Sequence, residues 1–150
     1  MSVPSALTVT SDVHIFQYSS DLAGASTKLQ ERLGGSNAKI AKINTTTSPA
    51  GVSGYVAGRS IAWLVGHGSS ADTKVGTKVS RAKAVEMDDI IAWLSGEKFT
   101  TIVDTCCEPD LRRKCDMKGL TYYCARDGQV VSQNQAHSSL DLWWSHNGMS

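Results

Sequence analysis

The sequence lacks an excess of charge of either sign. Its 150 residues include 15 Lys and Arg against 14 Asp and Glu, which gives a formal net charge of +1. A protein that binds nucleic acid by neutralising phosphates needs a basic surface, whereas the basic residues here are interleaved with acidic ones. We therefore expect no nucleic-acid partner.

Long hydrophobic runs are also absent. The longest apolar stretches, such as Ile61–Val65 and residues 90–94, are far shorter than the roughly 20 residues that a membrane-spanning helix requires. Residues 1–10 contain no basic flank and no sustained apolar block, so they do not resemble a secretory signal. These absences predict a cytoplasmic protein without membrane contact, and delivery into another cell is compatible with them.

Cysteine pairs with the spacing of a disulfide framework are missing as well. The four cysteines are Cys106, Cys107, Cys115 and Cys124. Adjacent cysteines point to opposite faces of a strand and rarely pair, which favours reduced thiols. Because no Cys-x2-Cys pair is present, a metal-binding domain that uses these cysteines with His67 is the weakest of our hypotheses.

The pattern that is present is typical of one α/β domain over residues 1–150. A chain of this length buries about 68–70% of its unfolded surface in a single core. Two continuous apolar runs, at residues 61–65 and 100–103, are typical of strands buried on both faces of a parallel sheet. Between them, residues 85–94 have helical spacing with acidic residues near the start. These three segments predict a strand, a crossover helix and a second strand.

The flanking segments extend this alternation. Further strands are predicted at residues 6–13, with an extension to Phe16, and at 38–44 and 120–125, and further helices at 20–33, 110–117 and 130–144. The predicted architecture is a three-layer α/β/α sandwich with a mostly parallel sheet of about five strands.

Both buried runs lead into residues that can do chemistry. Residues 66–69 are Gly-His-Gly-Ser, and residues 104–107 are Asp-Thr-Cys-Cys. Functional groups in such sheets lie at the carboxyl ends of the strands, and two parallel strands joined by one crossover are usually neighbours. We therefore expect His67 and Cys106 to converge.

This pair can serve as a base and a nucleophile. A thiol with a pKa of about 8.5 is mostly protonated at neutral pH, so a catalytic cysteine needs an imidazole to accept its proton. The same imidazole can then protonate the leaving amine. Taken singly, Cys106 is more typical of a buried structural thiol, and His67 is compatible with a turn residue. The matched positions of the two residues favour the catalytic pair.

The segments around these two residues resemble the caspase-fold cysteine peptidases, the clan that also holds legumain and gingipain, and above all the metacaspases. Residues 61–69 are IAWLVGHGS and residues 101–107 are TIVDTCC. In metacaspases one apolar strand ends in Gly-His-Gly-Ser and a second ends in Asp-Ser-Cys-His-Ser-Gly. Residues 88–90, Asp-Asp-Ile, also resemble the segment that precedes the cysteine strand in that family.

The resemblance implies a minimal cysteine endopeptidase that acts on proteins or peptides without a cofactor, and calcium activation is compatible with it. His67 would be the general base and acid, Cys106 the nucleophile, and the amides of Gly68 and Cys106 the oxyanion hole. Asp104 would line an acidic pocket that selects Arg or Lys before the scissile bond, although it could instead cap the strand end. Two further acidic residues are assigned to that pocket: Asp127 and Asp12.

The sequence also departs from the metacaspase pattern. Cys107 stands where metacaspases have His, and residues 108–109 are Glu-Pro where they have Ser-Gly. The alternative hypothesis is therefore a catalytically inactive caspase-like module that binds a partner. The oligomeric state is not predicted.

Overall fold

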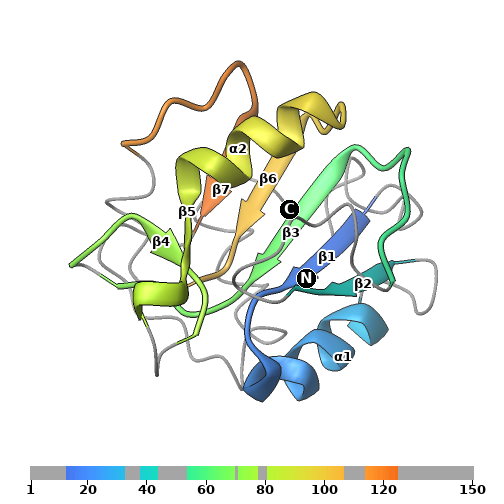
Figure 1. The fold of residues 1–150 in the computed structure, drawn as a ribbon. Coiled ribbons are helices and arrows are strands. Elements are labelled where there is room, and N and C mark those ends of the chain that lie inside the picture. The colour runs from blue at the N-terminus through green and yellow to red at the C-terminus, as the bar shows by residue number, and fades with distance from the viewer. Residues whose placement is uncertain are drawn as a thin grey trace.

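A parallel sheet forms the centre of the computed structural model, which describes residues 13–32, 38–43, 54–69, 71–77, 81–106 and 114–124. The strand order is β2-β1-β3-β6-β7, and every pairing in this sheet is parallel (Figure 1). The strands are β1 (Val13–Gln17), β2 (Lys39–Lys42), β3 (Ile61–Val65), β6 (Thr101–Asp104) and β7 (Thr121–Cys124). The predicted α/β fold with a five-stranded, mostly parallel sheet is confirmed.

Two helices pack against opposite faces of this sheet. The helix α1 (Ala23–Arg32), preceded by the 3-10 turn η3 (Ser20–Leu22), connects β1 to β2, and α2 (Met87–Gly96) connects β3 to β6. Alternate residues of a strand point to opposite faces. Leu29 of α1 accordingly shares a buried cluster with Trp63, whereas Leu94 of α2 shares a second cluster with Leu64.

The helix α2 shows how local sequence sets an element. Asp88 and Asp89 lie in its first turn, where carboxylates interact favourably with the helix dipole. Its predicted start is two residues early, because Val85–Glu86 forms the strand β5, which pairs antiparallel with β4 (Lys74–Val75). The short 3-10 turn η5 (Arg81–Lys83) precedes β5.

Several other predicted boundaries differ from the structure. The strand β1 contains Val13 and the predicted extension to Phe16 and ends one residue later, whereas residues 6–12 of that prediction lie outside the described residues. All five residues of β1 are buried because the strand lies inside the sheet. The helix predicted at residues 110–117 is wrong for residues 114–117, which are described and are not helical. The helix predicted at 130–144 lies outside the described residues, so the full outer layers of the sandwich stay a prediction.

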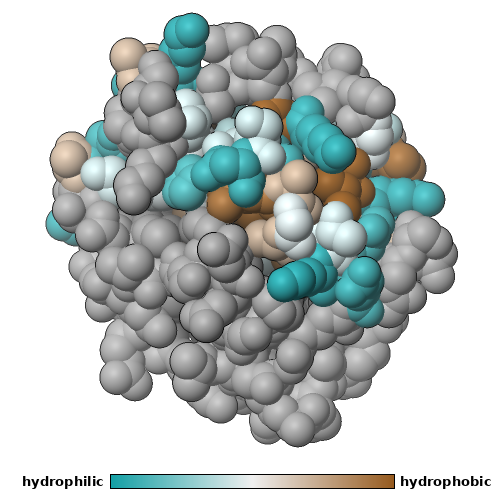
Figure 2. Space-filling model, turned by 90° about the horizontal axis from the view of Figure 1, so that it is seen from below, coloured by the Kyte–Doolittle hydropathy of each residue, from teal (hydrophilic) through white to brown (hydrophobic). Residues whose placement is uncertain are grey.

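The described surface is mixed in character. Val56, which is 38% exposed, is the one large hydrophobic side chain found exposed among the described residues. Seen from below, the coloured part of the surface has hydrophobic atoms in small groups between hydrophilic ones (Figure 2). Within the described ranges, neither helix is long and apolar enough to cross a membrane.

The order of the strands defines a place for a ligand. From β1 the chain crosses to β2 on one side, and from β3 it crosses to β6 on the other. The sheet is therefore wound in two directions, with the switch point between β1 and β3. In open α/β sheets ligands bind outside the carboxyl ends of the strands at this point.

Candidate active site

An acid and a histidine meet across the switch point. Asp21 follows the carboxyl end of β1, and His67 follows that of β3. The Nε2 atom of His67 lies 2.9 Å from Oδ2 of Asp21. The Asp21 side chain is 63% exposed and the His67 side chain 14% exposed, so the pair lies at the surface of the sheet's carboxyl edge.

Both members of this pair are held by further contacts. The backbone of His67 forms a two-way bridge with Gly76, with N···O distances of 2.8 and 3.1 Å. The Ser19 hydroxyl donates to the second carboxylate oxygen of Asp21. This hydrogen bond and the contact with His67 hold the pKa of the Asp21 carboxyl below its ordinary value.

Asp21 is a functional candidate that the sequence analysis missed. It is the second residue of the helix predicted at residues 20–33, where the helix dipole is by itself a sufficient reason for an acidic side chain. The available signal was its place just after the first strand of a sheet with a switch point, which becomes visible only when the strand order is known.

Cys106 lies at the same edge of the sheet, two residues beyond β6. The strands β3 and β6 are neighbours as predicted, with Leu64 opposite Asp104. The sulfur of Cys106 lies 3.8 Å from the carbonyl oxygen of Leu64. It also lies 3.6 Å from the point where a Cβ on Gly66 would stand, so the thiol packs against the residue that precedes His67.

The two candidate catalytic side chains have their described contacts on different faces. Cys106 is 0% exposed and belongs to the buried cluster on the α2 face. His67 contacts Asp21, which lies in η3, directly before α1. The structure brings both residues to one edge and buries the sulfur in this conformation.

Asp104 is buried beside the thiol. One of its carboxylate oxygens accepts the amide hydrogen of Cys106 at an N···O distance of 2.9 Å, and the other accepts the Tyr122 hydroxyl. The first contact is the strand-end cap that the sequence left open as an alternative. Burial, together with the charges of Cys106 and Asp104, raises the pKa of Tyr18 nearby. The Cys106 amide, a candidate oxyanion donor, is thus engaged with Asp104 here.

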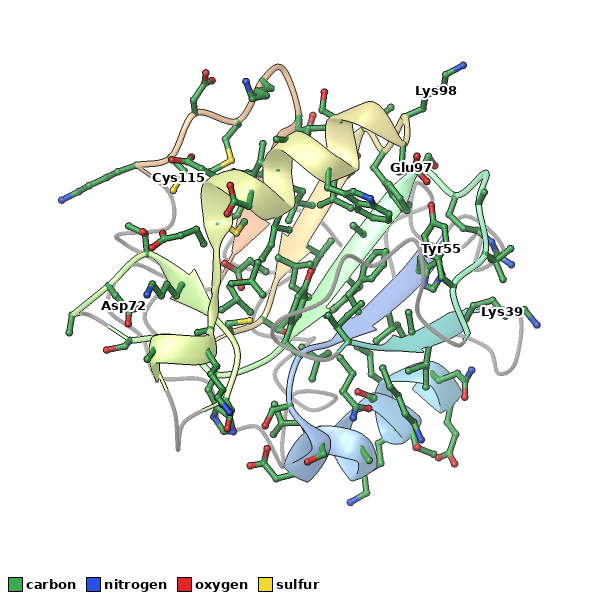
Figure 3. All side chains as sticks on the ribbon, in the orientation of Figure 1. Lys39, Tyr55, Asp72, Glu97, Lys98 and Cys115 are labelled. Atoms are coloured by element: carbon green, nitrogen blue, oxygen red, sulfur yellow. The ribbon has the colours of Figure 1, made fainter. Side chains whose placement is uncertain are left out.

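The remaining residues named in the sequence analysis have fewer described contacts or none. Gly68 is described and half-buried, directly after His67. Asp12 and Asp127 lie outside the described residues. Cys115 is half-buried and packs on the α2-face cluster (Figure 3). No group of three or more His, Cys, Asp or Glu that could hold a metal ion occurs among the residues that the structure places.

Comparisons with known proteins add no relative to this picture. The chain matches no protein-family model, and no match is found among curated proteins or solved structures.

Proposed function

We propose that this chain is a caspase-like cysteine endopeptidase in which Cys106 is the nucleophile and His67 the general base and acid. The observation that carries the proposal is the Asp21–His67 pair at the switch point, next to Gly66, against which the Cys106 sulfur packs. A base oriented by a third group beside a nucleophile is the general arrangement of nucleophilic catalysis. Asp21 takes the orienting role in this proposal.

The proposed reaction proceeds in two steps. His67 accepts the thiol proton, and the sulfur of Cys106 bonds to the carbonyl carbon of the substrate. The C–N bond breaks while the imidazolium passes its proton to the departing amine, which leaves a thioester. Water then attacks the thioester as His67 takes its proton, the carboxylic acid departs, and the proton returns to the sulfur. Asp21 stabilises the imidazolium in both steps. No cofactor enters this scheme.

The proposal requires the thiol side of the edge to open. The Cys106 sulfur is buried, and its amide must leave Asp104 before it can donate to an oxyanion. Asp104 must also release the Tyr122 hydroxyl before its carboxylate can bind an Arg or Lys side chain. We therefore propose that the described arrangement is a resting conformation. In an open conformation, Asp104 is released and selects a basic residue before the scissile bond.

A second candidate function is favoured by that same burial. If the contacts of Asp104 and Cys106 are permanent, the chain is a caspase-like module that binds a partner without catalysis. For either function we propose a reducing cytoplasmic location, which the lack of disulfide-framework spacing among the cysteines supports.

The test is hydrolysis of peptides that carry Arg, Lys or Asp before a reporter amine, measured with and without calcium. We expect the wild type to cleave after Arg and Lys, and Cys106→Ala to lose at least about 1000-fold in kcat/KM. Cys115→Ala is the matched control, since it removes a cysteine side chain that lies outside the proposed site, and we expect a change below about twofold. Equal rates for wild type and Cys106→Ala would refute the thiol mechanism.

A further inference from the structure

The Asp21 carboxylate has a described contact at each of its two oxygens. Oδ2 lies 2.9 Å from Nε2 of His67, and Oδ1 accepts the hydroxyl hydrogen of Ser19. The side chain of Asp21 is 63% exposed, so packing alone does not hold the carboxylate in one orientation. These two contacts therefore decide which oxygen faces the imidazole.

Ser19 is the anchored member of this arrangement. It is 7% exposed and has an extended backbone, with φ −148° and ψ 134°, directly before η3. Its carbonyl oxygen accepts two hydrogen bonds, from Nε2 of Gln17 and from the amide of Leu22, each at 3.1 Å. His67 is also held through its backbone, by the bridge with Gly76. The exposed carboxylate thus lies between two residues whose backbones are fixed.

The contact with Asp21 decides which nitrogen of the neutral His67 ring carries the proton. A neutral imidazole has one protonated nitrogen, which donates, and one unprotonated nitrogen, which accepts. An ionised carboxylate only accepts, and the lowered pKa of the Asp21 carboxyl keeps it ionised at neutral pH. Nε2 of His67 therefore carries the proton while it contacts Asp21, and Nδ1 is the nitrogen that can take up a proton.

We propose, on the basis of the proposed peptidase function, that Ser19 is a positioning residue: through Asp21 it keeps the proton of neutral His67 on Nε2, so that Nδ1 accepts the proton of the Cys106 thiol. Without the Ser19 hydroxyl, the exposed carboxylate can turn away from the ring, and the fraction of neutral His67 with its proton on Nδ1 rises. In that form the nitrogen that must accept the thiol proton is already protonated, so the reaction cannot start from it.

The test reads the proton position directly and does not depend on catalysis. Histidine labelled with nitrogen-15 in the ring is incorporated into the full chain, and the ring shifts are followed by NMR as the pH is raised until they no longer change. The loss of signals in His67→Gln assigns those of His67. We expect the wild-type ring to carry its proton on Nε2. In Ser19→Ala the ratio of the Nδ1–H form to the Nε2–H form should rise about 2–10-fold, the effect of up to one hydrogen bond.

Two control variants should keep the wild-type ratio. Ser19→Thr retains a hydroxyl, and the side chain lines a cavity of about 450 Å³ at the carboxyl ends of β1 and β2, which has room for the additional methyl group. Thr27→Ala on α1 removes a hydroxyl that donates to the carbonyl of Ala23 instead.

Further variants keep the test decisive if Ser19→Ala fails to fold. Ser19→Gly also lacks the hydroxyl, and glycine is well tolerated directly before a helical turn, so the same rise in the ratio is expected. Asp21→Asn changes an exposed side chain, and its amide can donate to Nε2, which should move the ring proton to Nδ1. A wild-type ring with its proton on Nδ1, or an unchanged ratio in the variants without the Ser19 hydroxyl, overturns the proposal. An Asp21→Asn ring that keeps its proton on Nε2 overturns it as well.

Cleavage of peptides with Arg before the scissile bond separates this proposal from the peptidase function. Ser19→Ala should lower kcat about 2–10-fold and leave KM unchanged, since Ser19 acts on the proton transfer. Cleavage by Ser19→Ala at the wild-type kcat overturns the role of Ser19 alone. A ratio that depends on the Ser19 hydroxyl, with no peptide cleaved by the wild type, supports the positioning of the ring and overturns the peptidase proposal alone.

Discussion

The two strands that flank β3 differ in the solvent exposure of the side chains at their carboxyl ends. On the β1 side, Asp21 and His67 are in hydrogen-bond contact at the surface, beside a cavity. On the β6 side, Cys106 and Asp104 are each 0% exposed and are bonded to each other through the Cys106 amide. One side of the edge is accessible to a ligand, and the other is closed by its own side chains.

In the proposed peptidase, this difference separates two tasks, which are proton transfer by the base and exposure of the thiol. The base side needs no rearrangement, because Asp21 already contacts the His67 ring. On the thiol side, the polar groups of Asp104, Cys106 and Tyr122 are hydrogen-bonded to one another. In the proposed mechanism these bonds are replaced by contacts with the substrate. Changes that act on Gly66, Tyr122 and Ser19 test this division between an accessible side and a closed side.

The largest effect is expected at Gly66, where the two sides meet. A Cβ there would lie 2.8 Å from Cγ1 of Val75 and 3.0 Å from Cβ of Tyr18. Gly66→Ala should therefore overpack the edge and lower the free energy of unfolding by about 2–3 kcal/mol, measured by urea denaturation.

Gly24→Ala is the control for this change. Gly24 lies in α1, and a Cβ there would have nothing within 4 Å. Because alanine favours a helix over glycine, this variant should gain about 0.5–1 kcal/mol. A Gly66→Ala protein as stable as the wild type would mean that the thiol and the β3 edge are not tightly packed.

A smaller effect is expected from opening the closed side at Tyr122. Tyr122→Phe removes the hydroxyl that donates to Asp104 and leaves a buried carboxylate oxygen with one donor fewer. The free energy of unfolding should fall by about 1–2 kcal/mol, and alkylation of Cys106 by iodoacetamide should become faster.

Tyr55→Phe provides the comparison, because the Tyr55 hydroxyl also donates to a carboxylate, that of Glu97, at 2.8 Å (Figure 3). Its acceptor Glu97 is only partly buried, whereas Asp104 is fully buried, so loss of the Tyr55 bond should cost less than about 1 kcal/mol and leave alkylation of Cys106 unchanged. Equal alkylation rates in the two variants would show that Tyr122 does not keep the thiol closed.

The fold was predictable where apolar runs are unbroken. The bounds of β3 are those predicted, since Ile61–Val65 is a continuous buried run. The sequence predicted most of β1 only as an extension to Phe16, because His14 and Gln17 are polar but buried, which a hydropathy pattern reads as exposed. The pairing of β4 with β5 was missed because each has two residues and only their tertiary contact defines them.

In the candidate site, the sequence predicted only the residues that directly follow buried strands. His67 and Cys106 were placed at one edge because each follows a buried strand. Asp21 reaches His67 across 46 residues of sequence, and Tyr122 reaches Asp104 across 18. Such pairings depend on strand order and on side-chain packing, which local sequence patterns do not encode.

The smallest effect is expected on the accessible side, in the titration of Asp21. Its carboxyl has a lowered pKa in the folded protein, so its contribution to stability is present above about pH 4 and is lost as the pH falls through the folded pKa. The Ser19 hydroxyl is the largest cause, so Ser19→Ala should raise the pKa of Asp21 toward 3.8, followed by NMR of the carboxyl carbon. Thr27→Ala removes a hydroxyl that instead donates to the carbonyl of Ala23 and should leave the pKa unchanged. An unchanged Asp21 pKa in Ser19→Ala would show that the Ser19 hydroxyl does not stabilise the carboxylate that contacts His67.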